Sequence, residues 1–339
     1  PSIALDVVAV AASTSYGLSG RMTQLSGERD QNVRIETDDG DFVLKIAGPL
    51  EDPSVVDFQV AVLKHLEATA PELPVPRIVD GIDGNAIGAI VDQSGSTCQM
   101  RLVTYLPGIT FDAERNVPAE PLRAIGRVQG KMCRALSGFD HAGADHFMPW
   151  DISNGLIGSD QLWRHAQADV IGVVGSHQEH LADVASSKFS DLRRQVIHND
   201  AHRGNLLRAD KSSHELTGVI DFGDMVKAPL IDDLAVSGSS FARASDDPIA
   251  AVEALATGFN SVFPLRDEEV GVLYDFILVR LVLGLLLFDF MIAKGSDYTT
   301  HVLRERPEAM DGLAKWLTVD SDLLTHRLHT SLRQVEHDR

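Results

Sequence analysis

Residues 196–234 decide the fold of this chain and read VIHNDAHRGNLLRADKSSHELTGVIDFGDMVKAPLIDDL. In this stretch Asp200 follows a short apolar run, and Asn205 comes five residues after it. A second apolar run ends at Asp221, which opens the tripeptide Asp-Phe-Gly. The order H-x-D-x-x-x-x-N and then D-F-G predicts a loop and a strand end that bring three oxygen-bearing side chains together.

These three side chains match the requirements of phosphoryl transfer. A γ-phosphoryl group moves when one carboxylate accepts the proton of the acceptor hydroxyl and other oxygen ligands hold Mg²⁺ on the phosphates. The spacing therefore predicts Asp200 as the catalytic base and Asn205 and Asp221 as the metal ligands. ATP or GTP would be the phosphoryl donor.

A metal-dependent hydrolase is the alternative interpretation of the same loop. His198, Asp200 and His202 could ligate zinc or iron, because imidazoles and a carboxylate stand close together in the chain. Asn205 and Asp221, at their observed spacing, favour phosphoryl transfer. We expect His198 to fix the loop by hydrogen bonding and not to act in catalysis.

The segments HNDAHRGNLL and GVIDFGDM resemble the aminoglycoside phosphotransferase family, which has a protein-kinase-like fold. In that family a histidine follows the catalytic aspartate by two residues, where this chain has His202, and an aspartate in a D-L-A segment supports the loop, as Asp233 would. Protein kinases carry an arginine directly before the aspartate, where this chain has Asn199, and no A-P-E segment follows Asp221. The resemblance implies a small-molecule acceptor and no protein substrate.

Two strands are expected at residues 31–37 and 41–46, joined by a tight turn. Lys45 lies in the second strand among apolar residues, where burial of a lysine is costly unless an anion meets it. The pattern predicts that Lys45 contacts the phosphates of the nucleotide. A strand-edge lysine that reaches solvent is the alternative.

Other residues of the first half would complete a nucleotide site. Ser26 and Gly27 stand where kinase-like folds lay a loop over the nucleotide, although an ordinary hairpin could have the same residues. Kinases hold the lysine with a glutamate from the next helix. This chain has no glutamate on the inward face of that helix, and Gln59 or Asp57 could orient Lys45 instead.

The segment RLVTYLPG ends a predicted strand, and the backbone groups of Thr104, Tyr105 and Leu106 would pair with the adenine edge; a plain strand exit is the alternative. The order of YGLSG, LSGERDQNVRI, DFVLKI, RLVTYLPG and IDFGDM resembles the hydroxylysine-kinase branch of the family. This resemblance implies an ATP- or GTP-dependent kinase of a small hydroxylated amino acid, amino alcohol or aminosugar.

The expected architecture is an α+β bilobal, protein-kinase-like fold. Residues 1–106 would form a small antiparallel-sheet lobe that binds the nucleotide. Residues 107–339 would form a larger, mostly helical lobe that carries the catalytic and acceptor-binding residues. With 339 residues and 44% hydrophobic content, the chain can bury the cores of both lobes.

Acceptor choice is expected to lie in the helical lobe. An amino-acid acceptor needs a cation for its carboxylate, and Arg203 and Arg280 are the candidates, although each could instead pair with a nearby acid. Trp150 could line the acceptor side or serve as a buried structural residue, and Asp224 could support the site. A hydroxylated amino acid or amino alcohol is favoured, with an aminoglycoside or a sugar as the alternative.

Composition narrows the partners and the compartment. A net charge of −19 disfavours nucleic acid and anionic membrane surfaces, because both repel an acidic protein. Two cysteines fit a reducing compartment. Arg280 and Asp289 interrupt the most hydrophobic stretch, which favours a core helix over a membrane span. We therefore expect a cytoplasmic enzyme. A catalytically silent nucleotide-binding module is the third interpretation of the sequence, beside the kinase and the hydrolase.

Overall fold

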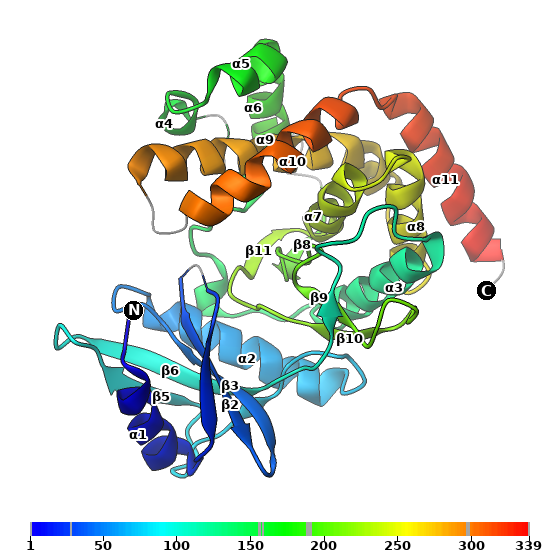
Figure 1. Ribbon diagram of the computed structural model, residues 1–339. Coiled ribbons are helices and arrows are strands. Elements are labelled where there is room, and N and C mark those ends of the chain that lie inside the picture. The colour runs from blue at the N-terminus through cyan, green and yellow to red at the C-terminus, as the bar shows by residue number, and fades with distance from the viewer. Residues whose placement is uncertain are drawn as a thin grey trace. The chain divides into compact units, whose positions relative to one another are not determined.

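The computed structural model describes residues 2–27, 29–154, 157, 159–187, 192–295 and 299–337. They form two compact units along the chain, which Figure 1 colours from blue to red. Unit 1 contains residues 1–107 and 141–146, and unit 2 contains residues 108–140 and 147–339. The expected boundary after residue 106 lies one residue before this division, and residues 141–146 of the first unit lie outside the expected N-terminal lobe.

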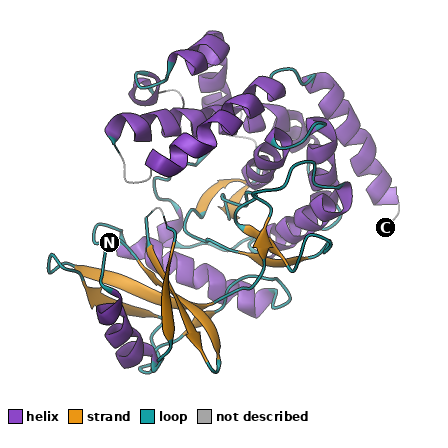
Figure 2. Cartoon of the chain, viewed as in Figure 1, coloured by secondary structure: helices purple, strands orange, loops and turns teal. Residues whose placement is uncertain are grey.

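Unit 1 is built on a six-stranded antiparallel sheet (Figure 2). Its strands are β1 (Arg21–Leu25), β2 (Gln31–Thr37), β3 (Gly40–Ile46), β4 (Ile78–Val79), β5 (Ile87–Val91) and β6 (Thr97–Thr104). They lie in the order β1-β2-β3-β6-β4, and β5 also pairs with β6. The hairpin of β2 and β3 confirms the two predicted strands, with β3 beginning one residue earlier than expected.

One face of this sheet forms a core with helix α1 (Leu5–Tyr16). Leu44 and Ile46 of β3 are fully buried there together with Val8 of α1. Successive strand side chains point to opposite faces, so Lys45, which lies between the two, belongs to the other face.

Helix α2 (Pro53–Thr69) packs against β4 and β6. Two residues favour its start: the side chain of Asp52 accepts a hydrogen bond from the backbone N–H of Ser54 at 2.8 Å, and Pro53 occupies the first turn. The buried side of α2 carries Gln59.

Unit 2 is mostly helical. Its helices are α3 (Ala119–Ala135), α4 (Asp160–Trp163), α5 (Ala168–Val174), α6 (Gln178–Ser187), α7 (Leu230–Arg243), α8 (Pro248–Asn260), α9 (Asp267–Lys294), α10 (Thr299–Trp316) and α11 (Ser321–His337). Its short strands are β7 (Ile109–Thr110), β8 (Arg194–Ile197), β9 (Leu206–Arg208), β10 (Leu216–Val219) and β11 (Val226–Pro229). They form two small antiparallel sheets, β10-β9-β7 and β11-β8, which carry the loops of the predicted site.

Helix α9 is the one described helix that is long and apolar enough to cross a membrane, and 61% of its most apolar window is buried inside the protein. Its two charged interruptions have partners within unit 2. Arg280 lies 3.8 Å from Asp200, and Asp289 accepts a bond from Arg306 at 2.6 Å. The burial and the pairing of charges fit the predicted core helix.

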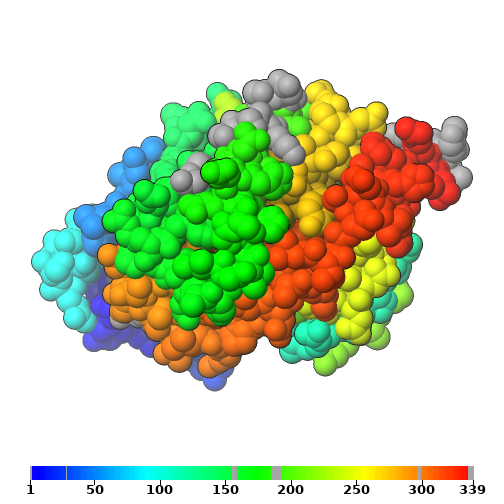
Figure 3. All heavy atoms as spheres, turned by 90° about the horizontal axis from the view of Figure 1, so that it is seen from above, coloured from blue at the N-terminus to red at the C-terminus, as the bar shows by residue number. Residues whose placement is uncertain are grey.

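Helices α4, α5 and α6 pack on α9. In the space-filling view they form the green surface beside the orange surface of α9 and α10 (Figure 3). Arg306 of α10 holds this segment, because it binds Asp169 at the start of α5 as well as Asp289 of α9. The segment is thus tied by charge to the core helix of unit 2.

Candidate active site

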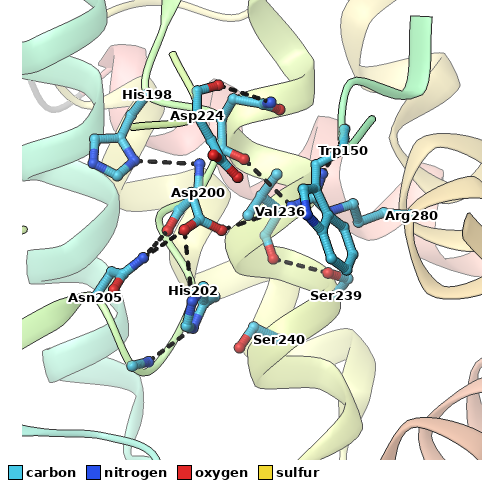
Figure 4. A network of polar contacts seen from close by, with 12 residues as sticks. Trp150, His198, Asp200, His202, Asn205, Asp224, Val236, Ser239, Ser240 and Arg280 are labelled. Carbon is cyan, nitrogen blue, oxygen red and sulfur yellow. Dashed lines mark hydrogen bonds and ion pairs between the residues drawn. The ribbon is translucent and has the colours of Figure 1, made fainter. Parts of the chain in front are cut away.

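The loop between β8 and β9 carries Asp200 and Asn205. The side-chain Nδ2 of Asn205 donates to Asp200 Oδ2 at 2.6 Å and to the Asp200 carbonyl at 3.0 Å (Figure 4). Because Nδ2 faces Asp200, the amide oxygen of Asn205 remains available as a ligand for a hard cation. The two residues that the sequence pairs are therefore in direct contact.

The end of β10 is joined to the same loop. Ile220 donates its backbone N–H to the carbonyl of Asn205 at 2.9 Å, so Asp221 follows directly after a residue bound to the loop. The backbone of Asp221 is left-handed, with φ 64°. The ring of Phe222 is buried edge-on against the ring of His198, with 4.7 Å between the two ring centroids. With Phe222 turned inward, the carboxylate of Asp221 is exposed.

Both histidines of the loop serve as backbone hydrogen-bond acceptors. His198 Nδ1 accepts from the N–H of Asp200 at 3.2 Å, and His202 Nδ1 accepts from the N–H of Gly204 at 2.9 Å. Each Nδ1 is therefore unprotonated and already used. Among the described residues no group of three or more His, Cys, Asp or Glu side chains is arranged to hold a metal ion. This geometry argues against the hydrolase interpretation.

His202 is neutral over the physiological range. Desolvation by the surrounding protein atoms, and then the neighbouring guanidinium groups of Arg243 and Arg280, lower the pKa of His202 to about 3, although 41% of the side chain is exposed. With Nδ1 occupied by a backbone N–H, the ring proton is on Nε2, which lies 3.8 Å from Asp200 Oδ2. His202 can thus donate toward the predicted base, or toward an anion beside it, without carrying charge.

Both backbone polar groups of Asn199 are hydrogen-bonded. Its N–H donates to Asp233 at 2.8 Å, and its carbonyl accepts from Arg280 at 3.3 Å. Asn199 has φ 62°, a left-handed conformation that asparagine tolerates better than most residues. The sequence analysis notes this position only as a departure from the protein-kinase arginine. Its structural role depends on two distant helices and has no local signal.

Asp233 lies in the first turn of α7 and is fully buried. Its second oxygen accepts a weak bond from the thiol of Cys133 at 3.5 Å. Burial raises the pKa of Asp233 to about 6, while the bond from Asn199 opposes the rise. The carboxylate is placed to support the loop, as the resemblance implies.

Asp232, the preceding residue, is also fully buried, and neither of its oxygens makes a close hydrogen bond. Burial, and then the nearby Asp151 carboxylate, raise the pKa of Asp232 well above its usual range. Of the two adjacent aspartates, the resemblance implies that Asp233 supports the loop, and Asp233 is the one that contacts Asn199.

Arg280 and Trp150 lie beside the predicted base. An Nη atom of Arg280 is 3.8 Å from Asp200 Oδ1, another donates to the carbonyl of Trp150, and the guanidinium lies 5.2 Å from the centre of the Trp150 ring (Figure 4). Trp150 packs edge-on against Phe288 of α9. These contacts use two of the five guanidinium N–H donors on carbonyls, and the others remain for an acid.

Arg203 points elsewhere. Its side chain is 3% exposed and binds Glu308 of α10 and the carbonyl of Glu114. Its backbone N–H donates to Ser240 at 3.1 Å. Of the two roles considered for Arg203, the structure supports partnership with an acid and not contact with an acceptor carboxylate.

Asp224, which follows the Asp-Phe-Gly tripeptide, contributes through its backbone. Its carbonyl accepts a bond from the side chain of Asn199 at 3.1 Å. The catalytic loop is thereby tied to the segment that carries Asp221. This contact fits the expectation that Asp224 supports the site.

In unit 1, Lys45 is half-buried on β3, where it pairs in register with Asn32 of β2. Asn32 Nδ2 donates to the carbonyl of Ser26 at 3.1 Å. A Cβ atom at Gly27 would lie 2.3 Å from the backbone carbonyl oxygen of Asp30, so only glycine fits this close approach. The loop of Ser26 and Gly27 is therefore bound to the strand next to Lys45.

The two candidates for orienting Lys45 differ in burial. Asp57 is exposed and contacts His141 Nε2 at 3.2 Å, a partner from the segment 141–146. Gln59 is 6% exposed and lies on the buried side of α2. Burial therefore favours Gln59.

The predicted adenine-pairing strand needs a correction. The backbone N–H of Thr104 donates to the carbonyl of Arg77 at 2.9 Å, and that of Tyr105 donates to the carbonyl of Asp41 at 2.9 Å. Neither N–H is available for a base, because both complete the sheet. The groups that remain candidates for pairing with adenine are the backbone carbonyls of Thr104, Tyr105 and Leu106 and the backbone N–H of Leu106.

Comparison with known proteins gives the family. The model of the phosphotransferase enzyme family (APH) matches residues 21–270. Hydroxylysine kinase of Mus musculus is 26% identical over 277 residues, covering 75% of this chain and 73% of the relative. Homoserine kinase of Azorhizobium caulinodans is 25% identical over 270 residues, covering 76% and 78%.

Solved structures show the same fold. A microcompartment-associated aminopropanol kinase matches with a TM-score of 0.71 at 19% identity, over 96% of this chain and 98% of the other. Amicoumacin kinase hAmiN, in complex with AMP-PNP, Ca²⁺ and Ami, matches with a TM-score of 0.70 at 17% identity, over 94% and 96%. The α+β bilobal kinase-like fold is thereby confirmed. The chain belongs to the phosphotransferase enzyme family, and it is a small-molecule kinase.

Proposed function

We propose that this protein is a Mg²⁺-dependent kinase that moves the γ-phosphoryl group of ATP or GTP to a hydroxyl group of a small hydroxylated amino acid or amino alcohol. The observation that carries the proposal is the direct bond between Asn205 and Asp200 at 2.6 Å. It fixes the carboxylate of Asp200 and directs the amide oxygen of Asn205 away from it. The carboxylate of Asp200 is thus placed to accept a proton, and the amide oxygen of Asn205 is placed to bind a cation.

Asp200 is the proposed general base. An acceptor hydroxyl would donate to a carboxylate oxygen at about 2.7 Å, and the proton would move to Asp200 as the phosphoryl group is attacked. The two backbone hydrogen bonds of Asn199 hold the chain next to the base, and His202 Nε2 lies 3.8 Å from the Asp200 carboxylate. Both contacts limit the motion of the base.

The donor set fits a magnesium ion. Mg²⁺ is held in proteins by one or two oxygen side chains together with substrate phosphates, and it is not usually enclosed by protein ligands alone. The amide oxygen of Asn205 and the exposed carboxylate of Asp221 would be those ligands. When bound, the ion neutralises phosphate charge.

Unit 1 is proposed to bind the nucleotide. Lys45 would meet the phosphates, Ser26 and Gly27 would lie over them, Gln59 would orient Lys45, and Leu106 would offer its N–H to the base. The bond from Asn32 to Ser26 supports this assignment, because it ties the loop to the strand beside Lys45. We propose accordingly that residues 1–106 form the nucleotide-binding lobe and that residues 107–339 form the catalytic and acceptor-binding lobe.

For the acceptor, Arg280 is the proposed contact to a carboxylate. A carboxylate two or three carbons from the hydroxyl lies roughly 4–6 Å from it, by bond lengths of about 1.5 Å. Arg280 lies 3.8 Å from Asp200, so an acceptor hydroxyl on the base would place a nearby carboxylate within its reach. Hydroxylysine kinase and homoserine kinase, by their names, act on hydroxylated amino acids, which supports this class.

An amino alcohol is supported by the aminopropanol kinase structure, and an aminoglycoside or sugar acceptor remains the alternative because aminoglycoside phosphotransferases share the fold. The acidic composition supports the further expectation that neither nucleic acid nor a membrane is a partner. The two cysteines support a cytoplasmic location, and the missing A-P-E segment supports the expectation that no protein is phosphorylated.

A coupled ADP-release screen tests the proposal. Hydroxylated amino acids, amino alcohols, sugars and aminoglycosides would be compared with ATP and with GTP, with Mg²⁺ and after chelation by EDTA. We expect turnover with at least one hydroxylated amino acid or amino alcohol, and loss of turnover with EDTA. Turnover confined to sugars or aminoglycosides would overturn the acceptor class, and metal-independent hydrolysis without an acceptor would overturn the reaction.

A further inference from the structure

Arg101 of β6 is a buried arginine next to Lys45 on the sheet of unit 1. The two residues are directly opposite in the antiparallel register of β3 and β6. Their side chains therefore leave the same face of the sheet, with Cβ atoms about 5 Å apart. The side chain of Arg101 is 3% exposed. The sequence analysis gives it no role.

Asp30 is the partner of this arginine. Arg101 Nη2 donates to Asp30 Oδ2 at 2.9 Å, and the side chain of Asp30 is 16% exposed. Asp30 lies in the turn between β1 and β2 that also contains Gly27, and a side chain at Gly27 would meet the carbonyl of Asp30 at 2.3 Å. The ion pair thus ties the proposed nucleotide loop to the central part of the sheet.

The ion pair with Asp30 occupies only part of the Arg101 guanidinium. Like charges directly opposite on neighbouring strands destabilise a sheet, so an anion between Lys45 and Arg101 would stabilise this face. Arg101 Nη1 is buried and makes no hydrogen bond. A buried guanidinium N–H without an acceptor is costly, so the geometry fits a face that receives an anion.

We propose that Arg101 is a second phosphate-binding cation beside Lys45, and that Asp30 positions it and holds the loop of Ser26 and Gly27. The ligand would be a phosphate oxygen of the nucleotide, so this inference rests on the proposed function of unit 1. It also explains physically why the segments LSGERDQNVRI and RLVTYLPG occur together, because one supplies Asp30 and the other supplies Arg101.

Equilibrium titration of the full-length protein with MgATP and with adenosine tests the proposal. Adenosine lacks phosphates, so the ratio of the two affinities isolates the phosphate contact. We expect Arg101→Gln to weaken MgATP binding by about 10- to 100-fold, the range of one charge-assisted hydrogen bond, and to leave adenosine binding within about 2-fold. Arg101→Lys should lie between this variant and the wild type, because one ammonium cannot serve both Asp30 and a phosphate.

Arg21→Gln is the matched control, because Arg21 of β1 pairs with Glu36 of β2 and the side chain of Arg21 is 77% exposed. It should leave both affinities unchanged. Asp30→Asn keeps the size of the side chain and should weaken MgATP binding by about 3- to 10-fold through the loosened loop. This variant keeps the test decisive if Arg101→Gln does not fold.

The outcomes separate the two proposals. If the wild type binds neither ATP nor GTP, the proposed function fails. If the wild type binds MgATP and the ratio of MgATP to adenosine affinity is the same in the Arg101→Lys and Asp30→Asn variants, Arg101 and Asp30 form only a structural ion pair and this inference is overturned.

Discussion

Asn199 donates its backbone N–H to the buried carboxylate of Asp233 at 2.8 Å, and this bond ties the loop that carries Asp200 to the first turn of α7. The backbone carbonyl of Asn199 accepts a hydrogen bond from Arg280 of α9. Two helices therefore hold the catalytic loop through the backbone N–H and C=O of one residue.

Replacement of Asp233 by alanine should destabilise the protein and lower its rate. The change leaves the buried N–H of Asn199 without an acceptor, which costs about 1–3 kcal/mol. Urea unfolding should show that loss, and kcat should fall because the loop is no longer held. Asp233→Asn, which keeps an acceptor oxygen, should recover part of both. A fully active and fully stable alanine variant would contradict this role.

Asp232→Asn, in contrast, should stabilise the protein. The folded pKa of Asp232 is raised, so the unfolded chain loses this proton at a lower pH than the folded protein does. The stability contributed by this group is full below the unfolded pKa of about 3.9 and is lost as the pH rises through the folded pKa. Because asparagine does not titrate, the variant should gain stability relative to the wild type between pH 4.5 and pH 8. Urea unfolding across this range measures the difference, and a constant difference would refute the assignment.

His202 should not set the pH dependence of the reaction. Its pKa of about 3 keeps the ring neutral at working pH, and its Nδ1 acts only as an acceptor for Gly204. In His202→Asn, the amide oxygen can take over that acceptor role. The acid limb of kcat/KM between pH 5 and 9 should therefore keep its position in the variant. Disappearance of an ionisation near pH 6 to 7 would show that His202 titrates in catalysis.

Arg280→Lys should reduce the preference for acceptors that carry a carboxylate. Homoserine and 3-aminopropan-1-ol differ only in that group, so the ratio of their kcat/KM values reports on it. We expect the ratio to fall by about 10- to 100-fold in Arg280→Lys. Any loosening of the Asn199 peptide would lower both rates together and leave the ratio unchanged.

Arg203→Lys is the control for that measurement, since Arg203 is buried against Glu308 and does not face Asp200. Its ratio should equal that of the wild type. A ratio that changes in Arg203→Lys but not in Arg280→Lys would reverse the assignment of the two arginines.

Local patterns in the sequence were sufficient for much of the fold. The cap at Asp52, the alternation around Lys45 and the spacing of Asp200, Asn205 and Asp221 all lie within short segments, and the structure shows the helix, the strand and the contact between Asp200 and Asn205. Periodicity and turn chemistry operate over such distances.

The remaining features depend on long-range contacts. Arg101 and Asp30 are 71 residues apart, and Asn199 and Arg280 are 81 apart, so no local pattern joins them. The segment 141–146 joins unit 1 through the contact of His141 with Asp57, 84 residues away. The choice between Arg203 and Arg280 also required the structure, because each arginine has acids nearby and only their positions distinguish them.

The most direct test of the account compares Asp200→Asn with Asp210→Asn in ADP release under saturating MgATP and acceptor. Asp210 is also an aspartate, but it lies on an exposed turn between β9 and β10, outside the catalytic loop. We expect kcat to fall by about 10²- to 10⁴-fold in Asp200→Asn, with ATP affinity retained, and to stay at the wild-type value in Asp210→Asn. An Asp200→Asn variant that keeps more than about a tenth of the wild-type kcat would contradict the central claim that Asp200 accepts the proton of the acceptor hydroxyl.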